Sequence, residues 1–390
     1  MKRFGTALLL ASASSALATG FSLNEVSARG NALQGALVGS TKDVSAVYFN
    51  PANLTQLEVG HVYTLFGITL ARPDFDTRVG SVTTDQDETI FTLPHLYVGG
   101  ALSDDWYAGL GFYSEYGLGT CYEGREKWPL SFDSTKTTIE SFSIVPSIAW
   151  KATDTLSFGA GLRVMYISFL SERYLPPYAS TFKVDADDWT VAWQASVAWQ
   201  ATETVRLGLV YRSESEFNAA GTASLSPLGI RTGVSGTLTM PQAVAAGINW
   251  QATDRLSLGF AATYTDWTSF DAINMHFDSM LPDQSAEKNW KESMRYSLGA
   301  EYRFDDHWTG MIGYTIDQGC YDINHADTMC PAGLREQYGI GVAYASGPWT
   351  YALDYMLVNI HDSDRSVMGV PFQIRHARTD TLGFSVGYVF

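Results

Sequence analysis

The sequence predicts an all-β transmembrane barrel of about fourteen antiparallel strands, with a helical or irregular N-terminal segment inside its lumen. Three observations lead to this prediction. The chain begins like an exported protein, its last ten residues alternate between apolar and small or polar side chains, and a short turn motif recurs along its length. Together they indicate a protein that leaves the cytoplasm and crosses a membrane with strands rather than helices.

The first eighteen residues have the order of a secretory signal peptide. Lys2 and Arg3 supply positive charge, residues 7–11 form an apolar stretch, and Ala16-Leu17-Ala18 forms a small-residue cleavage site. The apolar stretch is much shorter than the roughly 20 residues that a membrane-spanning helix needs. We therefore expect residues 1–18 to be removed and the mature chain to begin at Thr19.

The other end of the chain reads as a strand with one apolar face. From Leu382 to Phe390, large apolar residues occupy every second position, and the last residue is aromatic. This ending resembles the signal that outer-membrane barrels present to the barrel assembly machinery, which we therefore expect as a partner. The alternative is an ordinary edge strand at the end of a soluble domain.

Composition favours a barrel over a helical membrane protein. The 390 residues include 35 glycines and 13% aromatic side chains, but only 17% charged ones, as suits a wall with aromatic girdles. No apolar run approaches the length of a spanning helix. The net charge of −16 makes nucleic acid an improbable partner, because phosphate binding needs a basic surface.

The acidic residues and the cysteines suggest two smaller features. Acidic loops on the outside could hold divalent ions shared with lipopolysaccharide and other outer-membrane lipid, but simple solubility of the loops and turns is the favoured explanation. Three cysteines are an odd number for an oxidising compartment. Cys320 and Cys330 close the shortest loop and are the candidate disulfide, which leaves Cys121 unpaired.

An internal repeat counts the strands. The same turn motif begins at Trp150, Trp199 and Trp250. In each copy the tryptophan is followed by Lys or Gln, then Ala, Thr and an acidic residue, after which apolar and polar residues alternate again. Looser copies surround Trp106, Trp308 and Trp349. Each copy reads as a tight turn with an aromatic residue at its border, and longer polar segments lie between the copies. If both chain ends lie on the side of the short turns, the six turns join strands 2 and 3, 4 and 5, and so on up to 12 and 13. The barrel then has fourteen strands.

Alternation also assigns the faces of the strands. After Thr155, the apolar side chains from Leu156 to Tyr166 point to lipid, and the intervening residues point to the lumen. Because an Arg or Lys on the lipid face costs about 2–4 kcal/mol at the midplane, this phase places three arginines inside. They are Arg163, Arg212 and Arg295.

Residues 19–58 do not alternate, and they form the second part of the predicted architecture. This stretch is rich in Gly, Ala, Ser and Asn and lies before the first strand. It is either a periplasmic appendage or a plug, and we favour a plug because the lumen of a fourteen-stranded barrel leaks when it is empty. The predicted division is therefore a signal peptide (1–18), a hatch (19–58) and a barrel (59–390).

Four segments in this order resemble the outer-membrane long-chain fatty acid transporter family, which includes aromatic-hydrocarbon channels. They are residues 20–25 (GFSLNE), 50–52 (NPA), 113–118 (YSEYGL) and 264–270 (YTDWTSF). Each motif is weak alone, but together they span nearly the whole chain. The resemblance implies passive transport of a hydrophobic small molecule, a fatty acid or an apolar aromatic, across the outer membrane of a Gram-negative bacterium.

The resemblance also implies where the site lies. In the family, the first hatch residues help to form a ligand pocket, so we expect Phe21 to contact the ligand. Arg163, ahead of Arg212 and Arg295, is the candidate cation for a carboxylate head group, although barrel interiors also hold purely structural Arg–Glu pairs.

A lateral opening is the second expectation from the family. It should form in the third strand, which begins at Trp106, where Gly109 and Gly111 make a kink inexpensive. Asn50, Pro51 and Ala52 are expected to gate it, with Asn50 bonding to strand groups that the kink leaves unpaired. The alternative is that these three residues only form the turn into the first strand.

Other functions are weighed against transport. A barrel-embedded lipid hydrolase would need a nucleophile motif, and none of the seven histidines lies in one. A general porin would need an open lumen, which a plug of about forty residues contradicts. A structural or adhesive barrel is the third alternative. We expect no cofactor, no metal ion, no catalysis and a monomer.

Overall fold

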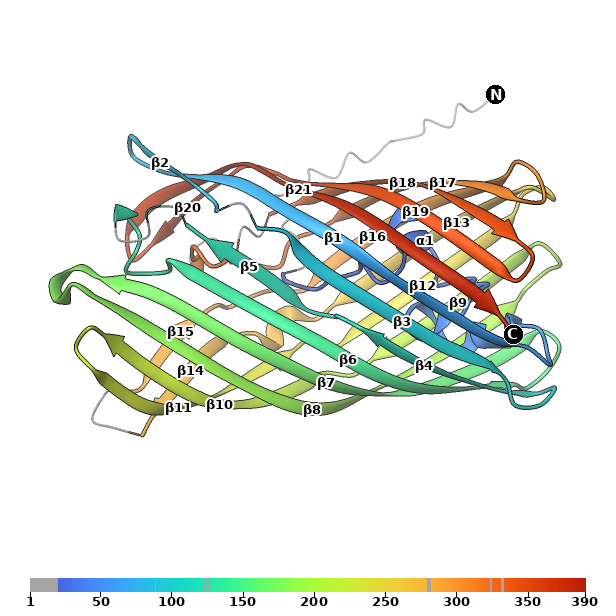
Figure 1. Ribbon diagram of the computed structural model, residues 1–390, viewed down its shortest axis with the longest axis horizontal. Coiled ribbons are helices and arrows are strands. Elements are labelled where there is room, and N and C mark those ends of the chain that lie inside the picture. Colours follow the sequence, from blue (N-terminus) through green and yellow to red (C-terminus); the bar gives the residue numbers. More distant parts are fainter. Residues whose placement is uncertain are drawn as a thin grey trace, which may run out of the picture.

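A computed structural model describes residues 20–390 except 88, 123, 125, 126, 279–281, 323, 324, 331 and 332. The predicted signal peptide lies outside these residues. The chain forms one closed antiparallel sheet around a short helical N-terminal segment (Figure 1). Among the described residues, no helix has the length and apolarity to cross a membrane.

The wall contains fourteen strands, as predicted, although seven of them are divided into two pieces. The pieces follow one another as β2/β3, β4/β5, β9/β10, β11/β12, β13/β14, β15/β16 and β19/β20. The strands are β1 (Val62–Val79), β2 (Val82–Asp85), β3 (Phe91–Ala101), β4 (Trp106–Tyr113), β5 (Gly117–Cys121), β6 (Lys136–Lys151), β7 (Leu156–Leu175), β8 (Ser180–Gln200), β9 (Val205–Arg212), β10 (Ser215–Ser226), β11 (Ile230–Met240), β12 (Ala243–Gln251), β13 (Leu256–Thr265), β14 (Ala272–Phe277), β15 (Gln284–Glu287), β16 (Ser293–Arg303), β17 (Trp308–Asp317), β18 (Arg335–Ser346), β19 (Trp349–Ile360), β20 (Ser363–Val367) and β21 (Val370–Val389).

The barrel closes where its first and last strands meet. β1 and β21 pair in antiparallel register from Tyr63↔Val389 to Arg78↔Gln373, with one irregularity at Asp74/Asp76. The six short turns predicted from the repeat lie at the end that carries the C-terminus, on the right in Figure 1. The strands extend much further at the opposite end, where β2, β15 and β20 lie.

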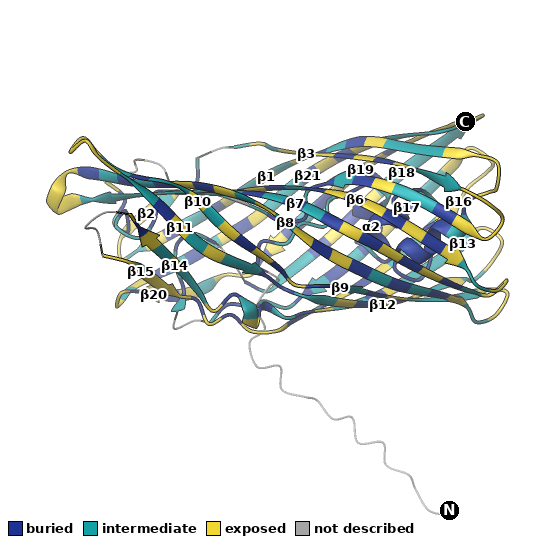
Figure 2. Cartoon of the chain, turned by 90° about the horizontal axis from the view of Figure 1, so that it is seen from below, coloured by how far each residue is buried: buried dark blue, intermediate teal, exposed yellow. Residues whose placement is uncertain are grey.

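Burial alternates along each strand in the phase that the sequence predicts (Figure 2). On β7, Phe158 and Leu162 are exposed, whereas Ser157 and Arg163 are buried. Two bands of exposed aromatic side chains border the lipid-facing surface. The inner band, near the short turns, is Trp106, Trp150, Trp199, Trp250, Trp308 and Trp349. The outer band includes Trp189, Tyr264, Tyr296, Tyr338 and Tyr355.

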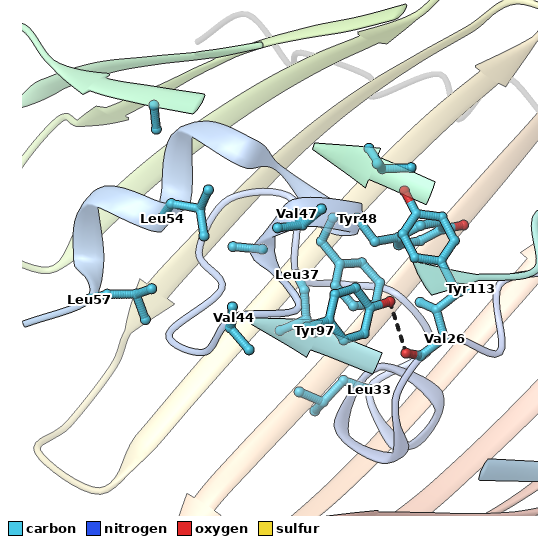
Figure 3. Packing of buried hydrophobic residues seen from close by; sticks show 14 of the residues in the cluster. Val26, Leu33, Leu37, Val44, Val47, Tyr48, Leu54, Leu57, Tyr97 and Tyr113 are labelled. Carbon is cyan, nitrogen blue, oxygen red and sulfur yellow. Dashed lines mark hydrogen bonds between the residues drawn. The ribbon is translucent and has the colours of Figure 1, made fainter. Parts of the chain in front are cut away.

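The N-terminal segment, residues 20–58, fills the lumen beside the short-turn end. It contains α1 (Ala28–Ala32), α2 (Ala46–Phe49) and the 3-10 helix η1 (Pro51–Gln56). Among the described residues, two further 3-10 turns lie outside this segment, η3 (Pro176–Tyr178) between β7 and β8 and η4 (Trp267–Ser269) between β13 and β14. We call residues 20–58 the hatch. Its apolar side chains pack against inward tyrosines of the wall, and the Tyr97 hydroxyl donates to the Val26 carbonyl at 3.0 Å (Figure 3).

Wall glycines let the hatch backbone lie directly against the strands. A Cβ added to Gly208 would lie 2.0 Å from the Val38 carbonyl oxygen, and one added to Gly259 would lie 2.2 Å from that of Ala36. Gly299, Gly313 and Gly339 make similar approaches to residues 31–33. Any side chain at these positions would displace the hatch, so the wall glycines provide close backbone contact rather than flexibility.

Candidate functional site

The N-terminal end of the hatch forms a single β-bridge with the inside of the wall, Ser22↔Tyr116. The Leu23 amide donates to the Glu115 carbonyl at 2.8 Å, and the Gly117 amide donates to the Phe21 carbonyl at 2.9 Å. These bonds fall where the third wall strand is interrupted, between β4 and β5. The N-terminal segment therefore satisfies backbone groups that the interruption would leave unpaired.

Phe21 is held in an aromatic cluster from the opposite side of the lumen. Its ring lies 5.0 Å from the ring of Trp267, 5.5 Å from Phe270 and 5.6 Å from Trp290, centroid to centroid. Trp267 and Phe270 come from the YTDWTSF segment, which turns inward as η4 instead of continuing the wall. The cluster links two motifs that are far apart in the chain, because Phe21 and Trp267 are separated by about 246 positions.

An apolar cavity opens beside this cluster, in the long extracellular half of the barrel. Its empty space, including the solvent at its mouth, is about 720 Å³. Phe21, the residue expected to contact the ligand, lines this cavity. The other apolar contributors are mainly Ile139, Phe169, Val184, Val234, Leu238, Phe270, Ile273, Met275, Trp290 and Met329.

One buried ion pair lines this cavity. The Lys288 side chain is 4% exposed, and its ammonium group contacts the Asp327 carboxylate. The Lys288 amide also donates to the Asp271 carbonyl at 2.6 Å, which fixes the start of the chain segment that leads into β16. Nearby, burial and then the charge of Asp327 raise the pKa of Asp133. A cationic group at the edge of an apolar cavity suits a ligand with an apolar chain and an anionic head.

The three predicted arginines face the lumen, but each has a partner of its own. Arg163 forms a buried ion pair with Glu115, with Nη2 and Oε2 2.5 Å apart, and donates to the Ser213 carbonyl at 3.0 Å. Arg212 lies over the Tyr48 ring at 4.6 Å and donates to the Tyr48 carbonyl. None of the three lines the apolar cavity in the part of the chain that the structure describes.

Arg295, like Arg212, donates a hydrogen bond to a backbone carbonyl of the hatch. It donates to the Gln34 carbonyl at 3.3 Å and to the Gln337 side chain at 3.1 Å. Together with Arg212 it therefore connects the wall to the hatch, whereas Arg163 connects two wall strands. The contacts correspond to the structural alternative considered above.

The predicted kink at Gly109 and Gly111 is absent. Both residues lie in the regular part of β4, paired with β3 and β6, and the strand is interrupted only at residues 114–116. The missing side chains serve a different purpose, because a Cβ on Gly109 would lie 2.6 Å from Val47 and one on Gly111 would lie 2.9 Å from it. The two glycines make room for the hatch.

Asn50, Pro51 and Ala52 also differ from expectation. The Asn50 amide donates to the carbonyls of Val38 in the hatch (2.9 Å) and Val197 in β8 (3.2 Å), and the Ala52 amide donates to Ser196 at 3.0 Å. The predicted bonds from Asn50 to the third strand are therefore wrong. This motif anchors the hatch to β8, while Val47 and Leu54 are the hatch residues beside Gly109.

The predicted disulfide is not formed. Cys320 and Cys330 are both buried in the same cluster as Phe21, but both are free thiols. Burial raises the pKa of the Cys330 thiol to about 11 and raises that of Cys320 further. Cys330 lines the apolar cavity, where a protonated thiol behaves as a small apolar group. Within the described residues, no group of three or more His, Cys, Asp or Glu side chains is arranged to hold a metal ion.

Sequence reasoning missed Lys288, Asp327 and Trp290. They lie in extracellular segments without alternation, where no periodic signal assigns a side chain to the lumen. The YTDWTSF segment was recognised as part of a resemblance, but its inward turn was not expected. An aspartate that caps the turn, Asp266, and the aromatic residues that follow are the signal that would have indicated it.

A closed barrel with a hatch in its lumen and an apolar cavity above that hatch defines an outer-membrane transport protein. A family model described as outer membrane protein transport protein (OMPP1/FadL/TodX) matches residues 9–368. The chain belongs to this family, which also places it in the outer membrane of Gram-negative bacteria.

Individual relatives agree with this assignment. Outer membrane protein P1 of Haemophilus influenzae is 25% identical, with 89% of this chain and 88% of the relative covered. A long-chain fatty acid transport protein of Escherichia coli is 23% identical over 85% of this chain and 84% of its own. Among solved structures, a Pseudomonas aeruginosa FadL homologue has a TM-score of 0.84 at 18% identity, covering 95% of this chain and 99% of the other. The toluene transporter TbuX of Ralstonia pickettii has a TM-score of 0.72 at 18% identity, covering 93% and 98%.

Proposed function

We propose that this protein carries long-chain fatty acids into the outer membrane by passive diffusion, without chemical change. The observation that carries the proposal is the buried Lys288–Asp327 pair in the wall of an otherwise apolar cavity. A long alkyl chain matches the apolar walls, and Lys288 supplies donors for a carboxylate. The relatives named as fatty acid transporters support the same substrate class.

The ion pair also distinguishes fatty acids from aromatic hydrocarbons. A hydrocarbon makes no hydrogen bond, so it gains nothing from an ammonium group in the wall of its pocket. A fatty acid instead gains a charge-assisted hydrogen bond, worth roughly 1.5–3 kcal/mol in a buried setting. The cavity therefore suits the amphipathic ligand better than the apolar one.

Release is proposed to occur sideways through the interrupted third strand. An apolar chain released into the aqueous periplasm would lose about 0.8 kcal/mol per exposed methylene, and lateral movement into lipid avoids that loss. β3 pairs with β4 only as far as Leu96↔Phe112, and β5 pairs with β6 alone. The edge of β3 beyond Leu96 therefore has no strand partner on this side among the described residues.

Phe91 is the side chain best placed to close this gap. Its ring lies over Gly119 of β5, where an added Cβ would be only 1.8 Å from a ring atom. The hatch residues Phe21 and Leu23 cover the same strand from inside. A ligand that displaces these residues would open a path from the cavity to the outer surface.

The proposal is tested by neutralising the ion pair without leaving a lone buried charge. In the double variant Lys288→Met/Asp327→Asn, fatty acid affinity should fall about tenfold to a hundredfold, because the head group loses its charged partner. Binding of an alkane of the same length should be unchanged. Trp290 lines the cavity, so quenching of tryptophan fluorescence in the purified protein can report both ligands.

Lys291→Met is the matched control. Lys291 lies three positions further along the chain, and its side chain is 63% exposed. It should leave both affinities unchanged. Equal fatty acid binding by the double variant and the control would remove Lys288 from the site, and a parallel loss of alkane binding would indicate a damaged cavity rather than a lost head-group contact.

A further inference from the structure

A second interruption of the wall lies on the side of the barrel away from β4 and β5. β11 and β14 pair only at Val234↔Phe277 and Ser235↔His276. The next ladder, between β12 and β13, begins at Ala243↔Thr265. Between these two places, residues 236–241 and 267–275 run along neighbouring wall strands without ladder pairing to each other. Four wall strands, β6, β7, β8 and the β9/β10 strand, separate this gap from β4/β5.

Hydrogen bonds and strand pairing define both ends of this gap. At its lower end, the Asp266 amide donates to the Gln242 carbonyl at 3.0 Å, and the Gln242 side chain donates to Asp266 at 3.1 Å. There the chain turns inward as η4, with Trp267 fully buried. After η4, the first part of β14 does not pair with β11. It forms a regular ladder with β15 instead, from Ala272↔Glu287 to Met275↔Gln284.

The apolar cavity and a depression on the outer surface border the same stretch of wall at this gap. A polar depression on the outside is lined by Asn218, His276, Asp283 and Gln284, among others. It shares six lining residues with the apolar cavity inside, namely Ala219, Ser235, Gly236, Thr237, Asn274 and Met275. Of these, Ser235, Thr237 and Asn274 are exposed residues of the outer face. One stretch of wall thus borders both hollows.

Gly236 lies at the narrowest part. A Cβ added there would be 2.4 Å from the Asn274 carbonyl oxygen and 3.9 Å from the Met275 Cα. The lack of a side chain keeps this position free while the backbones remain close. The gap begins immediately beyond Tyr264 of the outer aromatic band, so its polar rim faces the head-group layer rather than the hydrocarbon.

We propose that this gap is a side entrance, through which a single-chain amphipathic acid passes from the polar layer of the outer leaflet into the cavity. The inference rests on the proposed fatty acid transport. Asn218, Ser235 and Thr237 at the rim supply hydroxyl and amide groups that keep a carboxylate solvated, beside a His276 imidazole that is paired with Asp283. The alkyl chain would reach Leu238, Ile273 and Met275 on the inner side. Ligand would enter at β11/β14 and leave at β3/β5.

The test closes the gap reversibly. If the β11–β14 register continued beyond Ser235↔His276, Gly236 would pair with Met275 and Thr237 with Asn274, and Thr237 and Asn274 both lie on the outer face. In the variant Thr237→Cys/Asn274→Cys, oxidation should slow fatty acid uptake by intact cells about tenfold or more, and reduction should restore it. Fatty acid binding at equilibrium to the reduced, purified variant should equal that of the unaltered protein.

Asn218→Cys/Thr237→Cys is the matched control, because these residues face each other within the continuous β10–β11 ladder. Its cross-link lies beside the gap without spanning it, and the three native thiols are common to both proteins. Uptake by the control should not respond to oxidation. Normal uptake by the oxidised Thr237→Cys/Asn274→Cys protein, with the cross-link verified by mass spectrometry, would overturn the side entrance.

A second measurement needs no variant. A fatty acid with a photoreactive group midway along its chain, added to outer membranes, should label residues 235–237 and 274–276. Labelling of the cavity without labelling of this rim would place the entrance elsewhere. Absence of fatty acid binding to the unaltered protein would instead contradict the proposed transport function, so the two failures are distinguishable.

Discussion

At the scale of single residues, the buried Arg163–Glu115 pair holds two wall interruptions together. Glu115 lies in the interruption between β4 and β5, and its carbonyl accepts the bond from the Leu23 amide. Arg163 also donates to Ser213, which separates β9 from β10. The pair therefore fixes the place where the hatch end joins the third strand.

Removing one member of this pair should be costly. Arg163→Met leaves the Glu115 carboxylate buried without its partner and should lower the free energy of unfolding by about 3–5 kcal/mol. The double variant Arg163→Met/Glu115→Gln should lose clearly less, because no charge remains. Urea unfolding in lipid vesicles, followed by tryptophan fluorescence, measures both. Normal stability of the single variant together with lost fatty acid binding would restore Arg163 as a ligand contact.

At the scale of elements, the fit between the hatch and the wall depends on the glycines of the strands. Gly208→Val would bring a side chain to within 2.0 Å of the Val38 carbonyl, so the hatch should be displaced while the strand pairing of β9 is kept. Limited proteolysis of protein in membranes should then cut within residues 20–58. In Gly387→Val, where the nearest atom is 3.5 Å away, the hatch should stay protected. Equal protection of residues 20–58 from proteolysis in both variants would mean that the hatch accommodates the new side chain while it stays in the lumen.

The sequence predicted continuous elements better than interrupted ones. The turns after Trp150, Trp199 and Trp250, and the faces of β7, follow from residue-by-residue alternation and were correct. Alternation, however, reports which way a side chain points and not which strand it pairs with. It continues on both sides of residues 114–116 and 236–241, so it does not indicate that pairing stops there. The interruptions were therefore missed, and the bend was placed on Gly109 and Gly111.

The site shows the same limit. The resemblance directs attention to Phe21, which lines the cavity, whereas none of the three arginines expected near a head group does so among the described residues. Arg163, Arg212 and Arg295 point inward as alternation requires, but their partners come from segments far away in the chain. Lys288 reaches the cavity from a segment without any period. Contacts of this kind depend on the closed barrel as a whole.

At the scale of the whole molecule, the hatch makes the barrel a poor ion channel. Its backbone contacts strands from β7 round to β18, and apolar side chains occupy the space between. In a planar bilayer the intact protein should show no large steady conductance. Deletion of residues 20–58 should produce porin-like conductance, because fourteen strands enclose a wide lumen. A large current from the intact protein would support the porin alternative.

The closeness of hatch and wall also has a consequence for the order of assembly in time. Strands that approach the hatch backbone are distributed around the barrel, and the final seam joins β1 to β21, the two ends of the wall. A cylinder that closed first would have to admit the folded hatch past side chains that leave no room for it. The hatch is synthesised before every strand, so it is available as a template around which the sheet can wrap. Closure of the β1–β21 seam then becomes the step that traps the hatch.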